Sequence, residues 1–495
     1  MFAFLLLLQA QAPLQRAAQT ISPDDIRRRI GIIADDSMRG RDTPSPELDK
    51  VAQYIAGEYR RLGLKPGGDR GGFIQRYSID RVRVLGDSSA AFVHGGAGAT
   101  LKYGPDFILA DNMFESGDYA GEIVLVSGPL AAATADTAAL AGKMLVLAIP
   151  RLRGADRDRV FGWKPSGIVL LANAPDSGWA QIVSRNDRPQ MRNPSRDVGG
   201  PLTLVIRASS LAPLLASLGG DPAAAQGATT FSVKPLGGAQ LHVHARIDPV
   251  EKNSAPNVVG ILEGSDPVLK NEYVVFSAHM DHVGVAGPRG SGGCRAQGAD
   301  SICNGADDDG SGTVAVVEIA EAFARLNPRP KRSVIFLNVS GEEKGLWGSE
   351  YFSNHPAVPM TNIVADLNID MIGRNWKDTI VAIGKEHSDL GATLNRVGAA
   401  HPELNMRPID DIWPDENFYF RSDHYNFARK GVPILFFFNG THPDYHRVSD
   451  SPDKIDAEKE SRVAQLIFYL GVDVANAADR PKWNPDSYKR IVVGN

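Results

Sequence analysis

Residues 303–313 read CNGADDDGSGT, so three aspartates stand side by side between glycines. Adjacent carboxylates repel one another, and a solvated turn needs only one of them. A multivalent cation would cancel this repulsion, whereas the alternative is an ordinary acidic loop. The glycines let the backbone bend tightly, so that one aspartate of the three can bridge two cations.

Four further segments place an acid or an imidazole at the end of an apolar run. These donors are His279 and Asp281 after EYVVFSA, Glu342 and Glu343 after RSVIFLNVS, Asp370 at the end of IVADLNID, and Asp444 and His446 after VPILFFFN. Imidazole and carboxylate donors without a thiolate suit zinc, and manganese or cobalt match less well. One tetrahedral zinc cannot use so many acids, so the pattern predicts two metals that share a carboxylate.

The runs that carry these donors are near-continuous apolar stretches, typical of strands buried on both faces of a sheet. They occupy residues 272–278, 332–340, 363–370 and 432–439. Stretches such as GTVAVVEIAEAFARL between them are typical of helices. This alternation predicts an α/β layered domain with helices on both sides, in which ligands lie at the carboxyl ends of the strands.

The rest of the chain shows different patterns of apolar residues. Val51, Ile55, Tyr59 and Leu62 form one apolar stripe at helical spacing. From about residue 86 to 245, short β-like runs broken by Gly, Ala, Pro and Asp predict a mostly β insert with a few small helices. The expected boundaries are a signal peptide at 1–20, an N-terminal part of the catalytic domain at 21–85, the insert at 86–245, the catalytic domain at 246–480 and a tail at 481–495.

Composition excludes some partners and suggests a compartment. The chain has 495 residues, a net charge of −5 and no basic stripe, so nucleic acid is not an expected partner. No apolar run approaches the roughly 20 residues that span a membrane. The apolar run from Phe2 to Leu8, followed by Ala10-Gln11-Ala12, predicts a signal peptide and a secreted or periplasmic protein, although no Lys or Arg precedes it. In an exported protein the two cysteines, Cys294 and Cys303, can form one disulfide; two unpaired thiols are the alternative.

The order of the motifs resembles that of the co-catalytic di-zinc aminopeptidase family, which includes secreted bacterial leucyl aminopeptidases and glutamate carboxypeptidase II-like metallopeptidases. The matching order is H-x-D, GADDDGSG, GEE, an aspartate after a strand and a late histidine, over about residues 250–475. The resemblance implies a three-layer αβα zinc-peptidase domain with a mixed, mainly parallel central sheet. The insert more weakly resembles the protease-associated domain that many members carry.

The resemblance also implies roles for single residues. The ligands of two zinc ions would be His279, Asp308, Glu343, Asp370 and His446. Asp308 would bridge both ions, and Asp281 would hold the ring of His279. Glu342 would be the general base, and Tyr445 would stabilise the oxyanion.

Neighbouring residues are expected to play lesser parts. Asp307 and Asp309 would flank the bridging aspartate without binding metal, and His282 and His442 would lie around the ligands or at the rim. Ser422-Asp423-His424 resembles a segment near the family's active site, with a packed structural corner as the alternative.

The expected function is that of an aminopeptidase acting on peptide substrates. A glutamate-type carboxypeptidase is an alternative that would need cations such as Arg374, Arg407 and Arg421 for the substrate carboxylate. A glutaminyl cyclase would use a single zinc, and cyclases of the family as a rule lack the insert. A non-catalytic receptor of the same fold, like the transferrin receptor, would have lost its ligands, whereas the ligand pattern here is complete.

Overall fold

A computed structural model describes residues 13–95, 98–110, 114–133, 137–149, 151–152, 154–194, 200–287 and 293–493. The chain divides into two compact units, one formed by the residues up to Tyr77 together with Ser254 onwards, and the other by Ser78–Asn253. Of the predicted signal peptide at 1–20, residues 1–12 lie outside the described residues. Residues 13–18 are helical, and Ala17 and Ala18 are buried in the first unit, so its packed part begins before residue 20.

The first unit is built on a mixed sheet. In the described part of the chain this sheet has ten strands, ordered β17-β16-β18-β15-β13-β14-β12-β2-β9, with β1 paired to β12. Its last strand, β9, pairs with the end of β2 and belongs to the second unit. Their bounds are β1 Lys65–Pro66, β2 Ile74–Val84, β9 Gln190–Arg192, β12 Ile247–Leu262, β13 Tyr273–His279, β14 Ser333–Val339, β15 Ile363–Asp370, β16 Thr379–Ile383, β17 Arg407–Ile409 and β18 Ile434–Phe438. The central strands β14, β13, β15 and β18 are parallel, whereas β12 and β16 run antiparallel to their neighbours β14 and β18. The predicted mixed sheet is confirmed; its four central strands are parallel, whereas the pairings of β1 with β12, β12 with β14, β16 with β18 and β2 with β9 are antiparallel.

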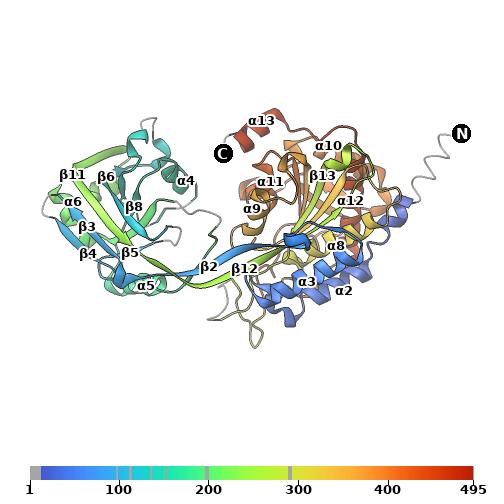
Figure 1. Cartoon of the computed structure of the whole chain (residues 1–495), viewed down its shortest axis with the longest axis horizontal. Helices are drawn as coiled ribbons and strands as arrows, with labels where there is room; N and C mark the ends of the chain where they lie inside the picture. Colours follow the sequence, from blue (N-terminus) through green and yellow to red (C-terminus); the bar gives the residue numbers. More distant parts are fainter. Residues whose placement is uncertain are drawn as a thin grey trace. The chain divides into compact units, whose positions relative to one another are not determined.

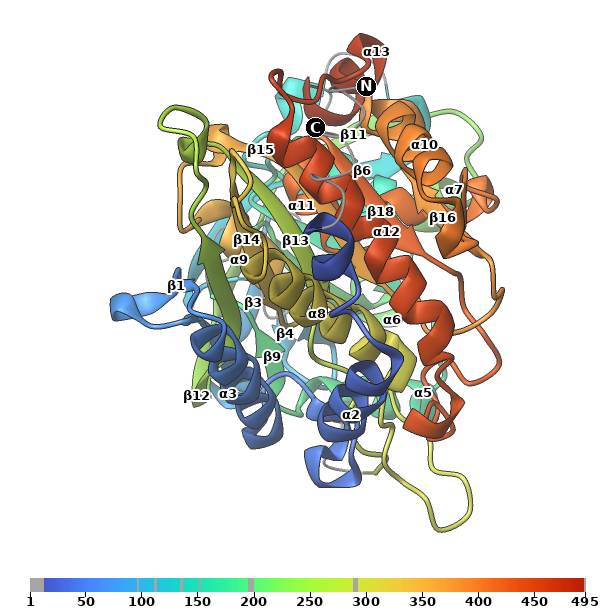
Figure 2. The same ribbon diagram turned by 90° about the vertical axis from the view of Figure 1, so that its right-hand side faces the viewer.

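Helices cover both faces of this sheet. They are α2 Pro23–Ile33, α3 Pro46–Arg61, α8 Gly312–Ala324, α9 Trp347–Asn354, α10 Leu390–Ala400, α11 His424–Ala428, α12 Ala457–Asn476 and α13 Pro485–Tyr488. Figure 2 looks onto the face that α2, α3, α8 and α12 cover. Helices α9 and α11 contact each other, and α11 packs against β15 and β18. The start of α3 is capped as its sequence suggests, because the Ser45 hydroxyl accepts the Leu48 N–H at 3.0 Å.

Alternate residues of the central strands serve two separate cores. In β13, Phe276 packs into the core that contains α8 and α12, whereas Val275 packs into the core that contains Phe352 and Phe427 of α9 and α11. Successive side chains of a strand point to opposite faces, so a strand with helices on both sides must be apolar throughout. This explains the unbroken apolar runs of the sequence.

The second unit contains the predicted insert and is described by itself. Its sheet has eight strands in the described residues, ordered β4-β3-β11-β6-β7-β8-β10-β5. The bounds are β3 Ala90–His94, β4 Ala99–Lys102, β5 Phe107–Leu109, β6 Gly117–Ser127, β7 Met144–Leu147, β8 Gly167–Ala172, β10 Leu202–Arg207 and β11 Ser232–Ala245, with helices α4 Gly154–Gly162, α5 Asp176–Asn186, α6 Ala208–Ser217 and α7 Pro222–Gln226. Strands β2 and β12 carry the chain into and out of this unit (Figure 1). The likeness to a protease-associated domain stays a prediction.

Two further features concern the environment of the chain. Cys294 and Cys303 form a disulfide, the first of the two alternatives that the sequence allows. Among the described residues, no helix combines the length and the apolar character that a membrane span requires.

A buried carboxyl in the middle of β15 makes the stability of the fold depend on pH. Asp366 is fully buried and accepts the Ser277 hydroxyl at 2.8 Å. Burial raises the pKa of Asp366 to about 8, and this hydrogen bond only partly opposes the rise. The ordinary pKa of an aspartate is about 3.9. The native state therefore binds more protons than the unfolded state between those values, so the free energy of unfolding falls as the pH rises through this window.

We expect Asp366→Asn to remove this loss of stability, because the amide keeps the bond from Ser277 and carries no charge. Urea unfolding in EDTA should show only a small advantage of the variant at pH 5, about 1.5 kcal/mol, because that pH lies about one unit above the ordinary aspartate pKa. At pH 9 the variant should be more stable by several kcal/mol, with roughly 6 kcal/mol as an upper bound. An equal fall with pH in both proteins would show that Asp366 is not the group responsible.

Candidate metal centre

The predicted donors come together at one edge of the first unit's sheet. His279 is the last residue of β13 and Asp370 is the last residue of β15. Glu343 follows β14, and His446 follows β18. These four strands are parallel, so their carboxyl ends lie at the same edge, which is where open α/β sheets bind ligands.

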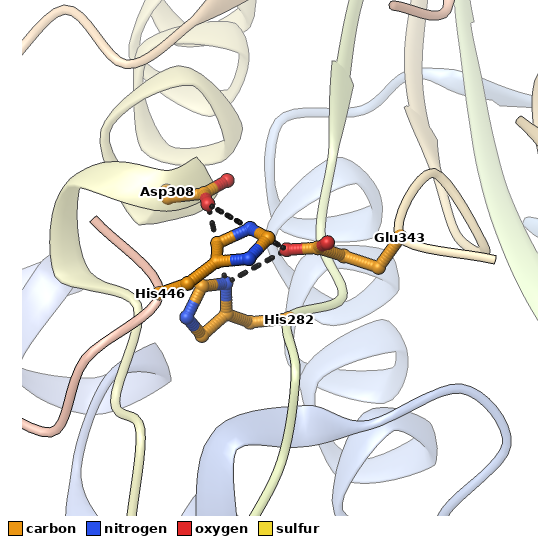
Figure 3. A group of neighbouring side chains, drawn as sticks. All are labelled: His282, Asp308, Glu343 and His446. Carbon is orange, nitrogen blue, oxygen red and sulfur yellow. Dashed lines mark ion pairs between the residues drawn. The ribbon is translucent and has the colours of Figure 1, made fainter. Parts of the chain in front are cut away.

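The donors form two groups that share Asp308. One group is His279, Asp308 and Asp370, and the other is His282, Asp308, Glu343 and His446; within each, one ligand atom per residue lies within 4.8 Å of the others. Oδ1 of Asp308 lies 3.5 Å from Nε2 of His279, and Oδ2 lies 3.1 Å from Nε2 of His446. The two oxygens of one carboxylate therefore face different groups. Figure 3 shows the four side chains of the second group pointing toward one another.

The three adjacent aspartates face three different surroundings. Asp309 accepts the backbone N–H groups of Gly312, Met371 and His279 at 2.9–3.2 Å. Asp307 accepts the N–H of Gly373 at 2.6 Å, and its other oxygen lies 3.2 Å from Nε2 of His442. Only the middle carboxylate is left to face both donor groups.

Two glycines permit this turn. Gly305 has φ +59°, and a Cβ there would lie 2.4 Å from Cγ of His282 and 2.3 Å from the carbonyl oxygen of Asp308. A Cβ on Gly312 would lie 2.3 Å from the carbonyl oxygen of Ile369. Any side chain would collide at either position, so the donor loop requires glycine there.

Buried atoms without hydrogen-bond partners mark where a cation fits. Within the described residues these include Oδ2 of Asp308, Oε1 of Glu343, Oδ1 of Asp370, Nε2 of His446 and both ring nitrogens of His282. Buried polar atoms in folded proteins are nearly always satisfied, so such a cluster calls for a ligand. Imidazole nitrogens and carboxylate oxygens form the donor set that zinc prefers. The residues present therefore fit zinc.

The charges in the site are strongly coupled. Burial lowers the pKa of His446, but Asp308 and Glu343 outweigh it and raise that pKa to about 10. Burial raises the pKa of Glu343, but the nearby imidazoles of His282 and His446, 3.1 and 3.2 Å from its Oε1, hold the value well below the ordinary one. The carboxylates thus favour positive charge in this space, and the same attraction would favour a divalent cation.

Glu342 and Tyr445 lie beside the donors. Burial raises the pKa of Glu342 well above its ordinary value, with His279 opposing the rise and Glu343 adding to it. The Tyr445 ring stacks on the His446 ring at a centroid distance of 4.0 Å. Burial and the carboxylates of Asp308 and Glu343 raise the pKa of Tyr445, so its hydroxyl keeps the proton that a hydrogen-bond donor needs.

Asp281 contacts His279 in two ways. Its carboxylate Oδ1 lies 3.6 Å from Nδ1 of the His279 ring, and its backbone carbonyl lies closer, at 3.2 Å. A proton on Nδ1 would therefore leave Nε2 free to face Asp308 and Asp370. The predicted contact between the Asp281 carboxylate and the His279 ring is present, and the backbone carbonyl of Asp281 contacts the same ring nitrogen.

Several residues around the site carry no signal in the sequence. The Thr43 hydroxyl donates to Oδ2 of Asp281 at 2.8 Å and accepts the N–H of Gly341, just before Glu342, at 3.2 Å. The fully buried Arg41 donates from Nε to the carbonyl of Met280 at 2.8 Å and from its other nitrogens to the carbonyls of Asn304 and Gly305. Nothing in the segment GRDT predicts contact with residues more than 200 positions away.

The structure also places the Ser422-Asp423-His424 segment and His282 relative to the donors. The Ser422 hydroxyl donates to Oδ2 of Asp370 at 3.1 Å, so this segment does reach the donors. His282 is fully buried within the second donor group, where the sequence suggested only a surrounding or rim position. The sequence feature that could have pointed to His282 is its position directly after the H-x-D motif.

Comparison with known proteins agrees with this geometry. Residues 257–471 match the model of peptidase family M28. A probable zinc metalloprotease of Pyrenophora tritici-repentis is 39% identical over 205 residues, covering 35% of this chain and 41% of the relative. A probable leucine aminopeptidase 2 of Aspergillus fumigatus is 30% identical over 200 residues, covering 39% and 34%. The matched stretch is thus less than half the length of either relative.

A solved structure is similar over a longer range. The aminopeptidase from Aneurinibacillus sp. strain AM-1 aligns with 95% of this chain and 98% of its own, at 17% identity and a TM-score of 0.49. Every donor described above lies within the stretch matched by the family model. Residues 257–471, which carry these strands, donors and helices, are therefore similar to peptidase family M28.

Proposed function

We propose that this protein is a zinc-dependent aminopeptidase whose centre holds two zinc ions. The observation that carries the proposal is Asp308, whose two carboxylate oxygens face two separate groups of buried donors. One ion would be held by His279, Asp308 and Asp370, and the other by Asp308, Glu343 and His446. A pair of zinc ions, when bound, polarises a scissile carbonyl and lowers the pKa of water.

The chain's own residues would supply the remaining chemistry. Glu342 accepts a proton from the attacking water and passes it to the leaving amine nitrogen. The Tyr445 hydroxyl donates a hydrogen bond to the oxygen of the tetrahedral intermediate. Asp281 and Thr43 keep the His279 ring oriented, since Thr43 bonds to Asp281 and Asp281 contacts the ring.

A carboxypeptidase receives less support, because two of the three arginines it would need have other partners and the third is exposed. Arg374 pairs with Asp444 at 3.0 Å, and Arg421 lies over the ring of Phe418 and pairs with Glu416. Arg407 is exposed on β17.

The test combines metal content with a substrate panel. Purified protein should contain two zinc ions per chain and hydrolyse aminoacyl p-nitroanilides with a free α-amino group, but not their N-acetylated forms. Chelation should abolish turnover, and added zinc should restore it. Turnover of N-blocked peptides from the carboxyl end would support the carboxypeptidase instead. One zinc per chain with cyclisation of N-terminal glutamine would support the cyclase, and absence of bound metal would overturn the proposal.

A further inference from the structure

His282 is a third imidazole in the centre that the five expected ligands leave without a role. Its side chain is 0% exposed, and neither ring nitrogen has a hydrogen-bond partner among the described residues. Nδ1 lies 3.1 Å from Oε1 of Glu343 and 3.6 Å from Oδ2 of Asp308. Nε2 of His446 lies 3.1 Å from the same oxygen of Asp308 and 3.2 Å from the same oxygen of Glu343, so both imidazoles border these two carboxylate oxygens.

We infer that His282 is a zinc ligand and that it makes the two metal positions unequal; this rests on the function proposed above. With His282, the position at Glu343 has four protein donors, namely two imidazoles and two carboxylates. The position at Asp370 has three, namely one imidazole and two carboxylates. Four protein donors are typical of closed structural zinc sites, whereas three leave a place for water or substrate.

The unequal donor sets have a functional consequence. The four-donor position fills first and holds its zinc tightly, whereas the three-donor position binds zinc more weakly and exchanges it. The catalytically competent two-zinc form therefore depends on how much zinc is available. The substrate oxygen and the attacking water are expected at the three-donor position, next to Asp370 and His279.

The inference is tested by binding rather than by activity. Metal-free wild-type protein is titrated with zinc against a competing chelator, and X-ray absorption at the zinc edge counts imidazoles per zinc. With one zinc per chain we expect two imidazoles in the wild type and one in His282→Ala. Changes around a zinc ligand already cost about 10- to 100-fold in affinity, so loss of the ligand should weaken the first zinc at least ~100-fold.

Two variants separate a ligand from a hydrogen-bond partner. His282→Gln keeps an amide that can donate to Glu343, so it should restore binding only if His282 acts through that hydrogen bond. His387→Ala removes another buried imidazole, one bonded to Ser487 at 3.1 Å, and controls for a general loss of packing. First-zinc affinity and imidazole count should fall in His282→Gln as in His282→Ala and stay at wild-type values in His387→Ala.

The outcomes distinguish this inference from the proposed function. Wild-type affinity and imidazole count in His282→Gln would overturn the ligand assignment while leaving the peptidase intact. A wild-type first zinc with two imidazoles, in a protein that hydrolyses no peptide substrate, would support the ligand assignment and overturn the function. A wild-type protein that binds no zinc would overturn both.

Discussion

Replacing Glu342 by Gln should nearly abolish turnover while both zinc ions stay bound. Glu342 lies beside the donors and belongs to neither donor group, and burial raises its pKa well above the ordinary value. The amide has almost the same shape but cannot accept the proton of the attacking water. Positioned proton transfer typically contributes 10²- to 10⁴-fold to a rate, and we expect a loss of kcat of about 10³- to 10⁴-fold.

The measurement is kcat on an aminoacyl p-nitroanilide together with zinc content of the same samples. Glu350→Gln serves as the control, because Glu350 lies on α9 and pairs with Arg429 at 3.0 Å, outside both donor groups. It should leave kcat within a few-fold of the wild-type value. Loss of zinc in Glu342→Gln would assign that residue to metal binding, and full activity would remove it from the mechanism.

Asp308→Asn should cost the protein at least one of its two zinc ions and its activity. The carboxylate presents Oδ1 to His279 and Oδ2 to His446, and an amide has only one oxygen to offer. One donor group therefore loses a negatively charged ligand. We expect zinc content to fall from two ions to one or fewer per chain, with kcat reduced by at least about 10³-fold. Two retained zinc ions would show that Asp308 does not bridge.

The neighbouring aspartate supplies a matched comparison. Asp309 accepts hydrogen bonds from three backbone N–H groups. In Asp309→Asn the side-chain NH₂ group would replace one accepting oxygen and point at a backbone N–H, so that hydrogen bond would be lost. Asp309→Asn should therefore lower the free energy of unfolding of the metal-free protein by about 1–3 kcal/mol. Asp308→Asn should change that stability less, because the Asp308 carboxylate repels Asp309 but attracts His446, and these two effects oppose each other. Urea unfolding in EDTA measures both.

Much of the architecture follows from local patterns in the sequence. The run IVADLNID is β15 with the predicted bounds, and GTVAVVEIAEAFARL contains α8. Such runs can be predicted as strands because a strand between two helical layers must be apolar at every position. Helix ends can be predicted because capping residues and glycines mark them. The donors at the strand ends were readable for a related reason, since parallel strands bring their carboxyl ends to one edge.

The sequence by itself therefore determined the α/β class, the four parallel strands at the centre of the sheet and most of the acids and imidazoles that lie at their ends. Only the tertiary structure decided which side chains share a space. In the folded chain Asp309 accepts backbone N–H groups, whereas Asp308 lies between the two donor groups. His282 is buried beside Glu343, and Thr43 donates a hydrogen bond to Asp281. Cys294 and Cys303 form a disulfide. The physical reason is that periodicity reports burial along one element, whereas a site depends on distances between elements far apart in the chain.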